Sequence, residues 1–152
     1  MKILILDDDE VRHERFKIHL FNFEVVHAHT YDQFLELVGK ERFDAIFLDH
    51  DLEFEEKAAT VIENRYANGM DAARHVAALP EKLRPELVVV HSWNMYAASR
   101  MMDVLLEAKY VSVRWVFESH ELPARLWKML RDIQLKEENA NSSDVGPSLR
   151  TP

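Results

Sequence analysis

Three short clusters of polar residues each follow directly on an apolar run, and their side chains are of types that bind metals or transfer protons. The clusters are Asp7-Asp8-Asp9, Asp49-His50-Asp51 and His91-Ser92-Trp93-Asn94. Carboxylates held close together raise each other's pKa or recruit a cation, and oxygen ligands suit Mg²⁺ or Mn²⁺. The candidate metal ligands are therefore Asp7, Asp8, Asp49 and Asp51. The alternative is that these aspartates only cap the helices that follow them.

The other residues of the clusters suit phosphate chemistry. Imidazole titrates near neutral pH, so His50 and His91 are candidates for general acid and base, for metal ligands, or for structural positions at the rim. Ser92 shows no triad-like arrangement with a base, and we expect it to donate a hydrogen bond to a phosphoryl oxygen. Asn94 either orients a ligand oxygen or caps the next helix. We expect surface or internally satisfied positions for the other histidines, which are His13, His19, His27, His29, His75 and His120.

The apolar runs predict five strands that alternate with five helices. The expected strands are 3–6, 24–28, 45–48, 87–90 and 111–117, and the expected helices are 10–20, 31–38, 69–79, 96–107 and 122–135. Thr30 with Gln33 is typical of a helix start, and Gly39 of a helix stop. The strands are apolar throughout, which indicates a parallel sheet buried on both faces. We predict a doubly wound α/β sandwich with strand order 2-1-3-4-5.

This strand order brings the three clusters together. In open parallel sheets, ligands bind beyond the carboxyl ends of the strands where the winding direction reverses, which here lies between the first and third strands. The charged segment 53–68 interrupts the third connection as an inserted loop or helix, and its Arg65 is a candidate substrate contact unless the segment is only a solvated surface helix. The main domain is expected over residues 1–136. Residues 137–152 are polar, and we expect a disordered tail there.

Composition narrows the classes of function. A chain of 152 residues suggests one domain, and 19 basic against 27 acidic side chains give a net charge of −8. The acidic balance argues against duplex DNA as a partner, but it permits a small phosphorylated or nucleotide ligand if a metal ion neutralises the charge locally. The absence of cysteine excludes disulfides and thiol chemistry. Because no apolar run approaches a membrane span and no signal peptide opens the chain, we expect a cytoplasmic protein.

The clusters also resemble a known family. Ile3-Leu4-Ile5-Leu6-Asp7-Asp8-Asp9, the strand-end Asp49, Gly69-Met70-Asp71 and His91-Ser92 are similar to a response-regulator receiver domain over roughly residues 1–136. The resemblance implies a flavodoxin-like fold, Mg²⁺ held by Asp7, Asp8 and Asp49, and phosphate accepted by Asp49. Receivers carry a lysine at the end of the fifth strand, whereas residues 115–120 contain none. The spacing from Asp49 to Gly69 is also about ten residues longer than in receivers.

A closer resemblance is to the cyclic-phosphate-processing receiver domains. Leu48-Asp49-His50-Asp51-Leu52 and His91-Ser92-Trp93-Asn94 match two motifs of that family, and Met101 or Met102 matches its methionine in the next helix. The resemblance implies hydrolysis of a cyclic phosphate or phosphodiester linked to nucleotide metabolism. Three functions stay open: a metal-dependent phosphoesterase, a stand-alone phosphoacceptor receiver, and a non-catalytic module that senses a nucleotide or binds a partner protein.

Overall fold

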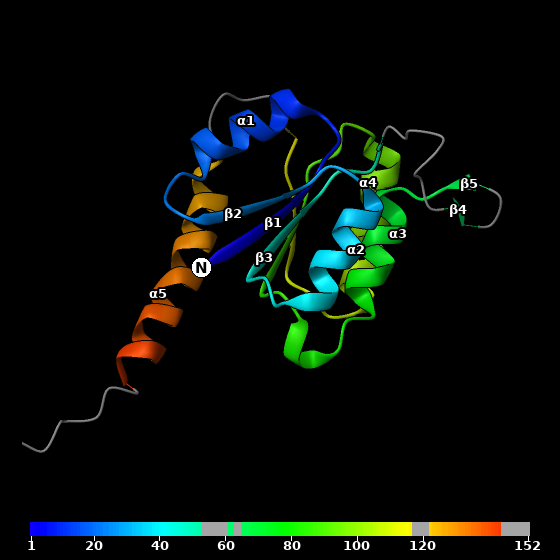
Figure 1. Ribbon diagram of the computed structural model, residues 1–152. Helices are drawn as coiled ribbons and strands as arrows, with labels where there is room; N and C mark the ends of the chain where they lie inside the picture. The colour runs from blue at the N-terminus through cyan, green and yellow to red at the C-terminus, as the bar shows by residue number, and fades with distance from the viewer. Residues whose placement is uncertain (53–60, 63–64, 117–121, 144–152) are drawn as a thin grey trace, which may run out of the picture.

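A parallel sheet between two layers of helices makes up most of the described chain, which comprises residues 1–52, 61–62, 65–116 and 122–143 of a computed structural model (Figure 1). The strands are β1 (Lys2–Leu6), β2 (Glu24–Ala28), β3 (Ala45–Leu48), β4 (Val61–Ile62), β5 (Arg65–Tyr66), β6 (Leu87–Val90) and β7 (Ser112–Arg114). The α-helices are α1 (Glu10–His19), α2 (Tyr31–Lys40), α3 (Gly69–Ala77), α4 (Met95–Glu107) and α5 (Ala124–Ser143). A short 3₁₀ helix, Glu81–Leu83, precedes β6.

The strand order of the large sheet is β2-β1-β3-β6-β7, and all its neighbouring strands are parallel. This confirms the predicted order 2-1-3-4-5, because β4 and β5 form a separate two-stranded antiparallel sheet. The register pairs Leu6 with Leu48 and Leu48 with Val90. The last residues of β1, β3 and β6 therefore lie level with one another.

Both faces of the sheet are covered, as Figure 1 shows, with α1 and α5 on one side and α2, α3 and α4 on the other. Side chains alternate between the faces along a strand, so Ile3 and Ile5 pack with Phe16 of α1 and Leu130 of α5. The intervening Leu4 and Leu6 belong to the opposite core with α2–α4. Burial on both faces explains why these strands are apolar at every position.

Several boundaries differ from those expected. Helix α2 continues past Gly39, the expected stop, and ends at Lys40. Strand β7 ends at Arg114, although the Trp115 amide still donates to the Val90 carbonyl. Helix α5 continues to Ser143, so residues 137–143 are helical and not part of an irregular tail. Residues 144–152 lie outside the described part.

The segment expected as an inserted loop or helix is described only in part. Residues 61–62 and 65–66 pair as the short antiparallel strands β4 and β5, and residues 53–60 and 63–64 lie outside the described residues. The helical alternative therefore does not hold for the four paired residues. In the described part of the chain, no helix combines the length and apolar character that a membrane crossing needs.

Gly69, the first residue of α3, packs directly against the end of β3. A Cβ atom at this position would lie 1.9 Å from the Asp49 carbonyl oxygen and 2.6 Å from the His50 Cα atom. Both are backbone atoms, which cannot move aside as a flexible side chain can. Only glycine permits this approach, so α3 starts beside the second polar cluster.

We predict that Gly69→Ala destabilises the fold by about 3 kcal/mol, because overpacking against backbone forces the helix away from β3. Gly39→Ala is the matched control, since its Cβ would meet nothing within 4 Å. In the helix interior it should stabilise by up to about 1 kcal/mol. Urea unfolding of both variants measures these free energies, and equal stabilities would contradict the predicted contact.

Candidate metal and phosphate site

Hydrogen bonds continue the sheet ladder by one residue beyond the strands and align the three polar clusters. The Asp7 amide donates to the Ala28 carbonyl at 3.1 Å, and the Asp49 amide donates to Leu6 at 3.0 Å. The His91 amide donates to the Leu48 carbonyl, also at 3.0 Å. Residues far apart in the sequence are thus held side by side at the carboxyl edge of the sheet.

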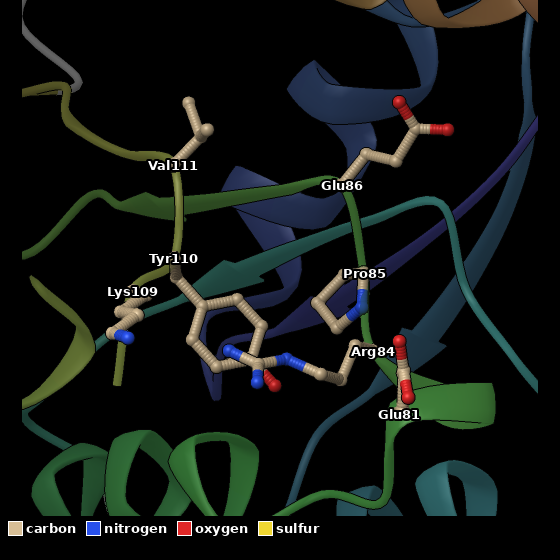
Figure 2. Close-up of a pocket in the computed structure, with 7 residues that line it drawn as sticks. All are labelled: Glu81, Arg84, Pro85, Glu86, Lys109, Tyr110 and Val111. Carbon is tan, nitrogen blue, oxygen red and sulfur yellow. The ribbon is translucent and has the colours of Figure 1, made fainter.

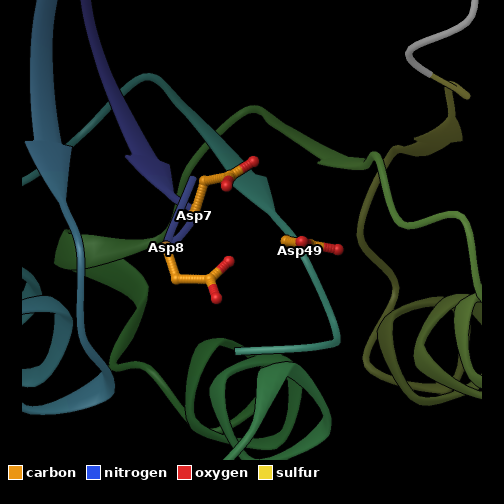
Figure 3. A group of neighbouring side chains, drawn as sticks. All are labelled: Asp7, Asp8 and Asp49. Atoms are coloured by element: carbon orange, nitrogen blue, oxygen red, sulfur yellow. The ribbon is translucent and has the colours of Figure 1, made fainter. Parts of the chain in front are cut away.

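Three of the four expected metal ligands form one group. Figure 3 shows the carboxylates of Asp7, Asp8 and Asp49, and one oxygen from each lies within 4.8 Å of the others. Asp7 and Asp49 are almost fully buried, whereas Asp8 is partly exposed. Asp9 caps α1, with its carboxylate accepting from the amides of Val11 and Arg12. The capping alternative is thus seen at Asp9.

Arg12, on the first turn of α1, contacts all three of these carboxylates. Its Nε lies 2.9 and 2.8 Å from the two oxygens of Asp7, and its Nη2 lies 2.8 Å from Asp49 and 3.2 Å from Asp8. The guanidinium is therefore a positive charge shared by the three carboxylates of this acidic group, and it offsets part of their negative charge. Arg12 was not foreseen from the sequence, although it lies four residues after Asp8, close enough for an ion pair at the start of α1.

The two buried carboxyls have pKa values displaced in opposite directions. Burial alone would raise the pKa of Asp7, but hydrogen bonds from His91 and Arg12 outweigh it and lower the pKa to about 2. Burial raises the pKa of Asp49, and the charge of Asp7 acts the same way against the opposing effects of His91 and Arg12. Of the two, Asp49 is the carboxyl that takes up a proton first.

His91 lies behind Asp7 and has no access to the surface. Its Nε2 donates to the Asp7 carboxylate at 2.9 Å, and both side chains are fully buried. The ring packs edge-on against Phe16, with centroids 5.1 Å apart. This differs from the position expected of a general acid, because a buried imidazole bonded to Asp7 cannot reach a leaving group. The contacts fit a positioning residue that orients Asp7.

His50 and Asp51 form a pair beside the acidic group. The His50 Nδ1 lies 2.6 Å from an Asp51 oxygen, and the His50 amide donates to the Asp49 carboxylate at 2.7 Å. Because a carboxylate only accepts, Nδ1 carries the proton and Nε2 is the basic nitrogen. Asp51 was expected as a metal ligand, but within the described residues its carboxylate is not part of the three-aspartate group and instead orients His50.

Ser92 and Asn94 join the end of β6 to α4. The Ser92 hydroxyl accepts from the backbone N–H of Asn94 at 3.2 Å. The Asn94 side-chain oxygen accepts from the backbone N–H of Ala97 at 3.1 Å. Asn94 is therefore the helix cap, one of its two expected roles. Asn94 also lines a hollow together with His50, and the cap uses only its side-chain oxygen, which leaves the NH₂ group as a donor for a ligand.

Arg65 lies on β5 and is held by Asp71 of α3. Its guanidinium donates to both carboxylate oxygens, at 2.7 and 2.8 Å. Asp71 in turn closes a capping box with Asn68 at the start of α3. This fixes Arg65 in the wall of two hollows that His50 also lines. Arg65 is thus near the site, as expected, but Asp71 was not foreseen as its partner.

A histidine cluster holds the backbone of Asp7 in place. His13 is buried, its Nε2 donates to the Asp7 carbonyl at 2.7 Å, and its Nδ1 lies 2.5 Å from the Nδ1 of His27. Burial lowers the pKa of His13, and burial together with His13 lowers the pKa of His27 to about 4. Both rings are neutral at pH 7. The expectation of internally satisfied histidines holds for this pair.

A third hollow lies at the opposite, amino edge of the sheet. Figure 2 shows its lining, which includes Arg84, Lys109 and Tyr110, and its volume is about 400 Å³. Arg84 stacks on the Tyr110 ring at 4.2 Å, and the Tyr110 hydroxyl donates to the Val76 carbonyl. These contacts tie α3 to the start of β7. Ligands of parallel sheets bind at the carboxyl edge, so this hollow is not the candidate site.

The acidic group fits a hard divalent cation. Its three ligands are all carboxylates, which Mg²⁺ and Mn²⁺ prefer, and their oxygens are close enough to share one ion. Arg12 binds the same oxygens, and its side chain is one-fifth exposed, so it already reaches the protein surface. A cation and the Arg12 guanidinium compete for the same charges.

We predict that Arg12→Gln destabilises the metal-free protein by about 3 kcal/mol, because buried carboxylates lose their counter-charge. Its Mg²⁺ affinity should rise about tenfold or more, since no guanidinium has to be displaced. Lys17→Gln removes an exposed positive charge from the same helix and controls for net charge. Calorimetric Mg²⁺ titration tests this, and weaker or unchanged binding in Arg12→Gln would show that Arg12 does not compete.

The lowered pKa of Asp7 predicts a pH-dependent contribution to stability. The folded value of about 2 lies below the unfolded value of 3.8. The stabilisation is therefore fully present above pH 3.8 and is lost as the pH falls to about 2, with a size of about 2 kcal/mol. Asp7→Asn should lack this pH-dependent part. Urea unfolding at several pH values across this range measures the free energy of unfolding of wild type, Asp7→Asn and the exposed control Asp103→Asn. A difference between wild type and Asp7→Asn that stays constant with pH would contradict the prediction.

Comparisons with known proteins agree with this geometry. The family model described as cyclic-phosphate processing receiver domain matches residues 2–107. No curated protein matches. Similar solved structures include a CheY-like receiver domain from Methylobacillus flagellatus, with 18% identity, a TM-score of 0.61, and coverage of 88% of this chain and 98% of that one.

Two further structures are similar in fold. The BeF3-activated N-terminal receiver domain of Klebsiella pneumoniae RstA is 19% identical, with a TM-score of 0.60 and coverage of 86% of this chain and 96% of that chain. A Burkholderia pseudomallei response regulator with a phosphorylated aspartic acid, calcium ion and citrate is 20% identical, with a TM-score of 0.54 and coverage of 99% and 75%. These likenesses show the receiver fold, and the family match over more than two-thirds of the sequence shows that the chain belongs to the cyclic-phosphate processing receiver domains.

Proposed function

We propose that the protein is a metal-dependent phosphoesterase that hydrolyses a cyclic phosphate or a nucleotide-type phosphodiester. The observation that carries the proposal is the His50–Asp51 pair directly beside the acidic group, with Nδ1 of His50 held at 2.6 Å by the Asp51 carboxylate. A carboxylate that fixes an imidazole leaves its other nitrogen available for proton transfer. Phosphate acceptance by Asp49 alone would not require such a pair.

Asp7, Asp8 and Asp49 would hold the metal ion, with Mg²⁺ or Mn²⁺ as the candidates. When bound, the ion supplies Lewis-acid stabilisation of phosphoryl charge and a lowered pKa for water. His91 and Arg12 favour ionised Asp7 through their hydrogen bonds, which keeps this ligand anionic at neutral pH. His13 holds the Asp7 backbone through the carbonyl. The ligand loop is thus supported from within the protein.

His50 would move the proton in hydrolysis. Its Nε2 can accept a proton from the attacking water or return one to the leaving oxygen, because Asp51 binds the opposite nitrogen. Asn94 would donate to phosphate oxygens through its exposed side-chain amide, and Arg65 would neutralise charge from the α3 side. Ser92, expected as a phosphate donor, is fully buried and accepts from the Asn94 backbone N–H, so we propose that it positions the turn between β6 and α4. These roles remain proposals for the substrate-bound protein.

A second candidate is a non-catalytic module that senses a nucleotide or binds a partner protein as an adaptor. The observation that favours it is Arg12, which already binds all three carboxylates without a metal. A third candidate is a stand-alone phosphoacceptor receiver. The absence of lysine from residues 115–120 counts against it, since the receiver mechanism uses a lysine there. Beryllofluoride binding in Mg²⁺ would support this third candidate.

The test is phosphodiester turnover with 2′,3′-cyclic nucleotides, 3′,5′-cyclic nucleotides and cyclic oligonucleotides in Mg²⁺, Mn²⁺ or EDTA. We expect metal-dependent hydrolysis that His50→Gln lowers by about 100-fold or more while Mg²⁺ binding is kept. Asp49→Asn should lose both turnover and Mg²⁺ binding. His19→Gln, on α1, is the matched control.

If the wild-type protein binds Mg²⁺ but hydrolyses none of these substrates, the sensor or adaptor function would be favoured. Turnover that His50→Gln leaves unchanged would remove His50 from the mechanism.

A further inference from the structure

A hollow of about 420 Å³ opens between the start of α3 and the start of α4, next to the acidic group. Its lining includes three arginines, which are Arg65 of β5, Arg74 of α3 and Arg100 of α4. We call it the arginine groove. Figure 1 shows α3 and α4 side by side along this face of the sheet. His50, Asn94 and Arg65 were expected near a site from the sequence, but Arg74 and Arg100 were not, because the three arginines come from separate elements.

The groove carries a local positive charge on an acidic protein. Asp71 binds Arg65 at 2.7 Å and lies 3.8 Å from Arg74, so one carboxylate is shared by two guanidiniums. The Arg100 guanidinium lies 6.0 Å from the centre of the Tyr96 ring. Three guanidiniums line the groove against two carboxylates, the shared Asp71 and the Asp51 that binds His50, which leaves a positive excess, whereas the whole chain carries −8. An anionic ligand is therefore favoured in the groove.

The groove adjoins the proposed reaction site through His50, although Asp7, Asp8 and Asp49 are not among its lining residues. His50 lines it and directly follows Asp49, and Asn94 lines it from the β6 side, two residues after Ser92. Gly69 holds the start of α3 against the Asp49 carbonyl, which fixes the distance between the two regions. A ligand whose reacting phosphate lies at the acidic group would extend past His50 into the groove.

One aromatic side chain in the groove suits a nucleobase. Tyr96 is 75% exposed on the first turn of α4, and its ring lines the groove beside Arg100. An exposed aromatic ring beside arginines is a common arrangement for stacking a base while binding its phosphates. A membrane surface or an acidic peptide would supply charge, but neither would use the ring in this way.

We propose that the arginine groove binds a second phosphate group of a nucleotide substrate, through Arg74 and Arg100, while Tyr96 stacks on the base. The inference rests on the proposed function for the position of the first phosphate. It narrows the substrate class to nucleotides that carry a phosphate in addition to the one that reacts. Mononucleoside cyclic phosphates without that group would then be poor substrates.

The test compares two probes that differ by one phosphate, adenosine 3′,5′-bisphosphate and adenosine 3′-monophosphate, by calorimetry in EDTA and in Mg²⁺. The wild-type protein should bind the bisphosphate about tenfold more tightly, as expected for charge-assisted contacts. Arg74→Gln and Arg100→Gln should each reduce this preference several-fold, and the double variant should remove most of it. Arg125→Gln, at an exposed position of α5, is the matched control and should keep it.

Tyr96→Leu should weaken both probes to a similar extent, since it removes stacking but not the charges. A wild-type protein that binds neither probe, or shows no preference, would overturn the proposal, as would a preference that survives in the double variant. A preference for the bisphosphate that depends on Arg74 and Arg100, without turnover of any phosphodiester, would support the phosphate site in the groove and contradict the phosphoesterase activity. The two proposals can therefore fail separately.

Discussion

Three carboxylates at the carboxyl edge of the sheet repel one another, and the surrounding structure has to compensate for that repulsion. The ladder fixes Asp7 and Asp49 side by side in buried positions, so neither can move away from the other. Arg12 supplies the balancing charge and His91 a hydrogen bond from beneath. Removing either partner would leave a buried charge uncompensated, which is costly in a protein interior. The start of α1, which carries Arg12, and the end of β6, which His91 directly follows, are both tied to this balance.

Buried residues behind Asp7 hold the acidic group in place. His13 binds the Asp7 carbonyl and His91 binds its carboxylate, so one residue is held at both its backbone and its side chain. Phe16 packs against the His91 ring and connects this arrangement to the core between α1 and the sheet. Stability and site geometry are therefore coupled through α1. Residues that orient a ligand in this way affect metal affinity without touching the ion.

Opposite charges are separated over a short distance at this edge of the sheet. The acidic group lies between β1 and β3, whereas the arginines lie along α3 and α4, with His50 between them. A phosphorylated ligand is attracted by the arginines and repelled by bare carboxylates, unless a cation is present at the acidic group. This arrangement favours a ligand that arrives with, or after, a metal ion. It also orients such a ligand along the groove.

The order of elements, the parallel sheet and the group of aspartates could be predicted from the sequence, because apolar runs and strand-end aspartates are local signals. His50 was also indicated, since its motif is continuous. The pairing of Asp51 with His50, the burial of His91 behind Asp7 and the contacts of Arg12 with the carboxylates follow only from the folded arrangement. These outcomes depend on side-chain directions at strand ends, which sequence spacing does not fix. The arginine groove has the same origin, since β5, α3 and α4 contribute one arginine each and meet only in the folded chain.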